Sequence, residues 1–134
     1  MSYRSASGQG PLIAGFGGKV FGLDPETGKR LWAWDTGSSS AVRLAIEEGA
    51  VFLLTRNFLA RVEIATGALV WQTTIPAADT LLVDRGRIFV GGAGEVRCYS
   101  FDGKLLWEDD FKGMGLGAVA LATEGKACQA DLWG

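Results

Sequence analysis

The chain has 134 residues, 48% of them apolar, and a formal net charge of −2. This length suits one ordinary domain, and the apolar share is enough for a hydrophobic core and far above that of disordered chains. No run of Lys or Arg marks a surface for nucleic acid or an anionic membrane, so neither partner is predicted. The sequence contains no His, which excludes a Ser-His-Asp triad and removes the commonest nitrogen ligand of zinc.

The N-terminal segment carries no secretory signal. Residues 1–9 form a polar tail rich in Ser and Gly, without an apolar segment before Gly10. Residues 41–54 are interrupted by charged residues and are too short to cross a bilayer. We therefore expect a cytoplasmic protein, or a periplasmic one if the chain is the mature part of a longer precursor.

One segment of the chain occurs three times. Residues 18–32 recur as 57–71 and, one residue shorter, as 94–107, and each copy ends in Trp. The steps between these Trp residues are 71 − 32 = 39 and 107 − 71 = 36. A period near 40 indicates an array of identical supersecondary units.

The middle repeat, about 41–74, shows the unit most clearly. It predicts four short strands at 42–46, 50–54, 58–64 and 68–73, dominated by β-branched and aromatic residues and without a sustained helical period. Residues 50–54 form a continuous apolar run, which is typical of a strand covered on both faces. We therefore predict an all-β chain.

The turn glycines set the phase of the other repeats. Gly10, Gly49, Gly86 and Gly125 occupy equivalent positions, so the first repeat, about 10–35, begins at the second strand of its unit. The third repeat, about 78–110, is complete, and an extra first strand is expected at about 116–123. Residues 126–132 predict a weaker second strand, followed by a tail. The chain thus encodes three units cut one strand out of phase.

The turn after the third strand carries the most specific local chemistry. In residues 24–28, Pro25 presets φ for the second position of a type I turn, and Gly28 can take the positive φ that returns the chain to the sheet. Residues 65–67 repeat this turn, whereas 101–104 is shorter and carries the Asp-Gly pair of a two-residue type I′ hairpin. The turn residues singled out are Asp24, Thr27, Gly28, Thr66, Gly67, Asp102 and Gly103.

Four-stranded units of about 40 residues are the blade pattern of a β-propeller. The signature of a small residue, Asp, Thr-Gly-Lys and Trp over residues 22–32 resembles the quinoprotein-type (PQQ-like) propeller repeat. The likeness covers roughly residues 10–132, and the second copy departs from it at Arg61, Glu63 and Ala68. In that family the repeated Trp docks between neighbouring blades, and the resemblance gives this role to Trp32, Trp71 and Trp107. Trp34 lies outside the repeat and is either an interaction surface or ordinary packing.

The resemblance also raises the question of pyrroloquinoline quinone. Family members that bind this cofactor use a stacking Trp, a calcium site of carboxylate and amide, and often adjacent cysteines. Here Cys98 and Cys128 are not adjacent and Asn57 is the only Asn, so no cofactor, metal ligand or catalytic residue is predicted. The two cysteines are interpreted as apolar thiols in strands, with a redox pair as the alternative.

Three blades are too few for a ring, because propellers close with about four to eight. The sequence predicts a homodimer of 2 × 3 = 6 blades, in which the extra strand of one subunit completes the N-terminal blade of the other. The residues expected to make this closure are Leu116, Val119 and Leu121. A fragment of a larger propeller is the competing interpretation.

Two classes of function remain. The first is a non-catalytic binding or assembly module whose loops contact a protein, peptide or glycan. The second is a subunit or remnant of a quinone-dependent oxidoreductase. A periplasmic scaffold similar to the lipoprotein of outer-membrane assembly is a third possibility, which the missing signal peptide disfavours.

Overall fold

The computed structural model describes residues 10–39 and 41–128, so the predicted tail at 1–9 and residues 129–134 lie outside it. The described residues form thirteen β-strands and no helix, which confirms the all-β prediction. Within these ranges no helix therefore has the length and apolar character needed to span a membrane.

The strands form three antiparallel blades and a short hairpin, in the order of the chain. The first sheet has three strands, β1 (Leu12–Phe16), β2 (Lys19–Leu23) and β3 (Arg30–Asp35). The second has four, β4 (Arg43–Glu47), β5 (Ala50–Leu54), β6 (Phe58–Glu63) and β7 (Leu69–Thr74). The third also has four, β8 (Thr80–Asp84), β9 (Arg87–Gly92), β10 (Glu95–Ser100) and β11 (Leu105–Asp109). The hairpin consists of β12 (Leu121–Thr123) and β13 (Lys126–Cys128).

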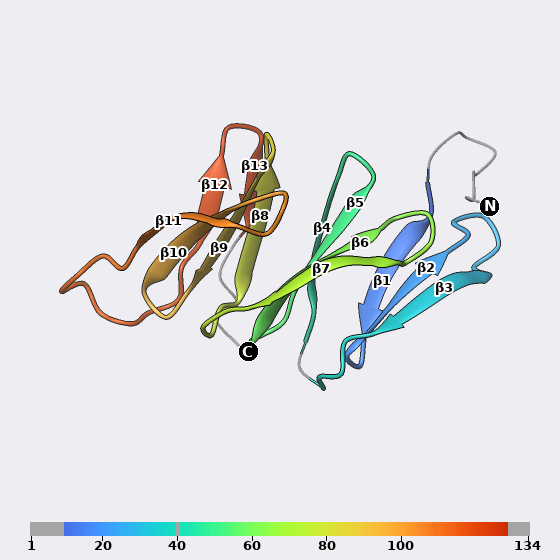
Figure 1. Cartoon of the computed structure of the whole chain (residues 1–134), viewed down its shortest axis with the longest axis horizontal. Coiled ribbons are helices and arrows are strands. Elements are labelled where there is room, and N and C mark those ends of the chain that lie inside the picture. Colours follow the sequence, from blue (N-terminus) through green and yellow to red (C-terminus); the bar gives the residue numbers. More distant parts are fainter. Residues whose placement is uncertain (1–9, 40, 129–134) are drawn as a thin grey trace.

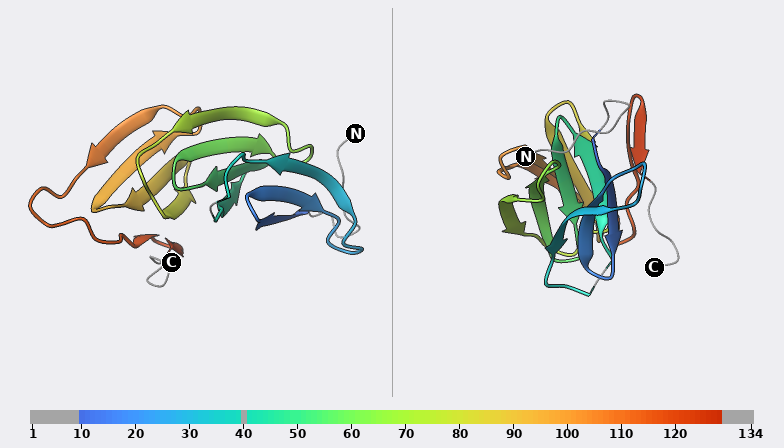
Figure 2. Two further views of the ribbon diagram at one scale, coloured as in Figure 1. Left: turned by 90° about the horizontal axis from the view of Figure 1, so that it is seen from below. Right: turned by 90° about the vertical axis from the view of Figure 1, so that its right-hand side faces the viewer.

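The three sheets follow one another along an arc (Figures 1 and 2). Each blade places its strands side by side in chain order, and the first strands of neighbouring blades, β4 and β8, lie against each other. The hairpin β12–β13 packs on β8 in the same way, at the place of a next blade. The arc is therefore a segment of a β-propeller, with its two outermost blades open toward whatever would continue the ring.

Strand β5 shows why the continuous apolar run forms a strand. All five of its residues are buried, and alternate side chains point to opposite faces of the sheet. Val51 and Leu53 belong to the core shared with the first blade, whereas Phe52 and Leu54 belong to the core shared with the third. The middle blade is thus buried on both faces, and its sequence has no polar side to display.

Two local predictions are wrong. The turn at residues 101–103 is not a type I′ hairpin, because Asp102 lacks the positive φ that this turn requires and only Gly103 has it, at 86°. The Gly103 amide donates to the Ser100 carbonyl (3.0 Å), and the ladder shifts register beside the turn. It is a three-residue loop with a glycine bulge, and therefore resembles its longer counterparts in the other blades.

The extra strand is also shorter than expected. The prediction was 116–123, but β12 begins at Leu121, so Leu116 and Val119 precede it. Gly113 and Gly115 have φ values of 84° and 101°, which an extended strand does not have. The Gly117 carbonyl accepts a hydrogen bond from the Gly94 amide (2.8 Å), so this segment binds the end of the third blade before the strand starts.

The core predicts a steep contrast between two leucines of the second blade. Leu53→Ala removes a fully buried side chain and should lower the free energy of unfolding by about 2–5 kcal/mol. Leu69→Ala, at a position 47% exposed on β7, should cost less than about 1 kcal/mol. Urea unfolding followed by circular dichroism measures both, and equal losses would contradict the two-sided burial of β5.

Candidate functional site

The junction between the first and second blades is built around Trp32. Its indole Nε1 donates to the Ile64 carbonyl of the second blade (2.9 Å). The face of the ring covers Gly67, and a Cβ added at that glycine would overlap the indole. A residue of β3 thus reaches across the gap and occupies the turn after β6 in the next blade.

The same contact recurs between the second and third blades. Trp71 Nε1 donates to the Phe101 carbonyl (2.7 Å), and a Cβ at Gly103 would lie 2.9 Å from the Trp71 ring. The role that the family resemblance gives to Trp32 and Trp71, docking between blades, is therefore what the geometry displays. A half-buried indole with a paired N–H combines apolar burial with a satisfied donor.

Trp107 occupies the equivalent position in β11, and its surroundings differ. Trp107 is 45% exposed. Among the described glycines, none would place an added Cβ against the Trp107 ring. Its closest aromatic neighbour is Phe89 of its own blade, with ring centroids 6.2 Å apart. The third docking role stays a prediction, because no opposite turn is present in the described part of the chain.

The predicted turn residues hold the turns after the third strand of the first two blades. In the first blade Asp24 Oδ1 accepts from the Glu26 amide (2.9 Å), and Thr27 Oγ1 accepts from the Lys29 amide (3.2 Å). Thr66 Oγ1 repeats the second bond by accepting from the Ala68 amide (3.2 Å). In the third blade Ser100 Oγ takes this place by accepting from Lys104, while Asp102 is exposed.

Of the two roles considered for Trp34, the structure shows ordinary packing. Its ring meets Phe58 edge-on at 6.3 Å and joins the core between the first two blades. Leu116, one of the predicted closure residues, is 84% exposed, Val119 lies beside Gly91, and Leu121 starts β12. The structure therefore does not bring the three closure residues together in one strand.

Sequence reasoning missed the role of Arg61. Its guanidinium Nη1 donates to the Phe101 carbonyl (3.2 Å), and it lies 5.9 Å from the centres of the Phe52 and Phe101 rings. Phe101 itself lies 4.7 Å from Phe52 and covers it. The signal was present, because Arg61 departs from the repeat pattern at the position that faces Trp71 across the sheet.

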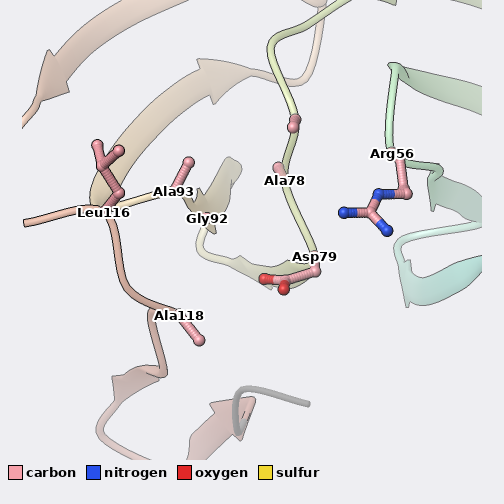
Figure 3. Close-up of a pocket in the computed structure, with 8 residues that line it drawn as sticks. Arg56, Ala78, Asp79, Gly92, Ala93, Leu116 and Ala118 are labelled. Carbon is pink, nitrogen blue, oxygen red and sulfur yellow. The ribbon is translucent and has the colours of Figure 1, made fainter. Parts of the chain in front are cut away.

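A small cavity of about 230 Å³ opens where the links between blades meet the turns (Figure 3). Arg56 comes from the turn between β5 and β6, and Asp79 from the link into β8. Small residues supply much of the remaining wall, including Ala78, Gly92 and Ala93. One Asp79 carboxylate oxygen is buried without a hydrogen-bond partner, and Asp79 and Arg56 give the lining of the cavity one negative and one positive charge.

The buried titratable groups of β10 belong to the core. Tyr99 is 5% exposed, and loss of solvation raises the pKa of its phenol above the ordinary value, while Arg97 nearby acts in the opposite direction. Cys98 is fully buried as a free thiol. Neither group is placed for acid–base or nucleophilic chemistry, because neither reaches a cavity described above.

Comparison with known proteins gives the family. A family profile described as outer membrane protein assembly factor BamB matches residues 55–130, more than half of the chain. The chain belongs to this PQQ-like β-propeller family. A search of curated protein sequences finds no match for it.

Solved structures agree with this membership of the PQQ-like family. The crystal structure of BamB from Moraxella catarrhalis is 25% identical, with a TM-score of 0.64, over 88% of this chain and 36% of that one. Quinohemoprotein alcohol dehydrogenase from Comamonas testosteroni is 21% identical (TM-score 0.61, 72% of this chain, 19% of that one). A europium-containing methanol dehydrogenase is 19% identical (TM-score 0.54, 73% and 22%). The chain spans about a third or less of these proteins, and the two dehydrogenases show the fold alone.

The residues do not fit the quinone cofactor of some PQQ-like propellers. Two of the three repeat indoles, Trp32 and Trp71, are engaged on glycine turns and cannot also stack on a cofactor. Among residues 10–39 and 41–128 no group of three or more carboxylate or thiol side chains is placed to hold a metal ion. No step through that cofactor is derived.

Because of the Trp32 contact, Gly67 is the glycine of the second blade at which a larger residue should destabilise the fold most. Gly67→Ala should cost about 1–2 kcal/mol of backbone strain at its φ of 75° and a further 1–3 kcal/mol or so for overpacking against the indole. Gly49→Ala, with a φ of 79° and no atom within 4 Å of the added Cβ, should show the strain alone. Chemical unfolding of both variants measures the difference, and equal costs would contradict the docking of Trp32.

Proposed function

We propose that this PQQ-like propeller segment is a non-catalytic binding and assembly module. The observation that carries the proposal is the exposed apolar surface at both ends of the arc. On β11 Trp107 is 45% exposed, and on β1 Leu12 and Phe16 are 56% and 79% exposed, whereas Val51, the counterpart of Leu12 in the middle blade, is fully buried. Large apolar side chains exposed on the outer blades mark a place where another protein surface binds.

The first partner proposed is a second copy of the chain. Two copies bring 2 × 3 = 6 blades, which lies within the four to eight that close a propeller. A ring of this kind covers both open blade faces at once. It also pairs the outer edge of β1 with a strand of the second copy. An unpaired edge strand promotes aggregation.

Strand exchange is the finer form of this proposal. In the described part of the chain the first blade has three strands and no innermost one, and β12 of the second copy would supply it next to β1. In the isolated chain β13 occupies that side of β12, through three residue pairs. β1 pairs with β2 over five residues, so it is long enough to pair with all three residues of β12. Exchange would therefore replace the β12–β13 pairing by a β12–β1 pairing, against the loss of the Lys126 contacts with Glu47 and the Val83 carbonyl.

The second partner proposed is a protein or peptide other than this chain. The cavity at Arg56 and Asp79 would take a polar group of such a partner, because it carries both charges within a wall of small residues. The similarity to BamB, named as an outer membrane protein assembly factor, supports protein partners over small substrates. The cytoplasmic location expected from the sequence stays a prediction, and cell fractionation separates it from the periplasmic alternative.

Solution mass tests the assembly. We expect light scattering to give twice the chain mass of 14.2 kDa at micromolar concentration. Truncation after Gly115 removes β12 and should weaken the dimer, whereas truncation after Thr123 removes β13 alone and should preserve or strengthen it. Thermal unfolding of each truncated chain establishes that it is folded. A stable monomer would contradict the ring, and a dimer indifferent to loss of β12 would contradict strand exchange.

The oxidoreductase alternative has its own measurement. Because the indoles are engaged and no metal cluster is present in the described residues, added pyrroloquinoline quinone and calcium should leave the melting temperature and the quinone absorption spectrum unchanged. A saturable thermal shift would favour the dehydrogenase interpretation instead.

A further inference from the structure

The chain carries one unmatched half of the blade junction at each end. Trp32 and Trp71 each lie on a glycine turn of the next blade, and Gly67 is buried by that contact. Within residues 10–39 and 41–128, Trp107 has a ring but no turn opposite it, and Gly28 has the turn but no ring within 4 Å of its Cβ position. The contact between a Trp ring and a glycine turn thus forms twice within the chain. Its two components are each present once more, the ring at one end of the arc and the turn at the other.

The open turn at residues 24–28 has the conformation of the occupied ones. The Asp24 amide donates to the Lys29 carbonyl (2.8 Å), and the Gly28 amide donates to the Asp24 carbonyl (2.8 Å). In the occupied turn the matching bonds, from Glu63 to Ala68 and from Gly67 to Glu63, are 2.9 and 2.8 Å long. The φ of Gly28 is 76° and that of Gly67 is 75°. The empty turn is thus already in the shape that receives an indole.

The exposed ring is held in the orientation of the docked one. Trp107 lies 6.2 Å from Phe89 with an interplanar angle of 48°. Docked Trp71 lies 6.5 Å from Phe52, the equivalent residue, at 47°. Trp107 therefore needs no large reorientation before it docks, which lowers the entropy lost on binding.

We propose that Trp107 of one copy docks on the Gly28 turn of a second copy, and that this contact closes each junction of the ring. Trp107 Nε1 would donate to the Pro25 carbonyl, the counterpart of the Ile64 and Phe101 carbonyls. Pro25 would cover Phe89 as Phe101 covers Phe52. This inference rests on the proposed two-copy ring and names the contact that forms it.

The symmetry of the contact decides the number of copies. Trp107 and the Gly28 turn lie at opposite ends of the arc, so the contact is head-to-tail and repeats until the ring closes. Two copies close it with two identical junctions and six blades. Three copies would need nine blades, above the usual range of propellers. The occupant of each end is therefore a second copy and not a longer array.

A methyl group on the turn tests the contact directly. Gly28→Ala removes no apolar surface, but its Cβ would overlap the docking indole, as a Cβ at Gly67 would overlap Trp32. Sedimentation should show a dimer dissociation constant weakened at least about tenfold, which corresponds to about 1.4 kcal/mol. Gly49→Ala is the matched control: it has the same positive φ and open space, lies in an inner blade, and should change the constant by no more than about twofold.

Variants of the ring complete the test. Trp107→Ala should abolish the dimer at micromolar concentration, and Trp107→Phe should give an intermediate constant, because it keeps apolar area and loses the N–H donor. Melting curves of each variant show that the monomer is folded. A wild-type dimer unaffected by Gly28→Ala overturns the Trp107 contact and leaves the ring standing. A wild-type monomer, trimer or filament overturns both.

Discussion

The contact on which this structure depends is an indole lying on a glycine. A blade is a small sheet whose faces are apolar, and it is stable only when neighbours cover it. Trp32 and Trp71 fix the distance between neighbours, because each ring fills the space where a side chain of the turn would be and its N–H binds the carbonyl beside it. The spacing between blades is thus set by a hydrogen bond and not only by general apolar contact.

This constraint explains which residues can vary between repeats. The turn may lose a residue, as it does at 101–103, provided that a glycine with positive φ still faces the ring and a carbonyl still faces the indole. The position opposite the Trp varies most: it is Gly22, Arg61 or Cys98. Arg61 uses that freedom to stack on Phe52 and Phe101, which adds a second bond to the same carbonyl.

The structure also shows why the two ends of the arc expose apolar side chains. The two cores lie between blades, so an outermost blade contributes only one of its faces to them. Leu12 on β1 consequently remains exposed, although Val51, its counterpart in the middle blade, is fully buried. Membership of the PQQ-like family gives the architecture, and these exposed surfaces are the basis of the proposed assembly.

The sequence by itself determined the strands of the three blades and their phase, because period-two patterns and turn glycines are local signals. The docking role expected of the repeated Trp came from the resemblance to the PQQ-like family. The sequence did not determine that β12 would start only at Leu121, since the carbonyl of Gly117 before it binds the Gly94 amide at the end of the third blade. It also did not reveal the cavity at Arg56 and Asp79, nor the contact of Arg61 with the Phe52 and Phe101 rings. These features depend on segments from different blades meeting in space, and only the tertiary structure decides which segments meet.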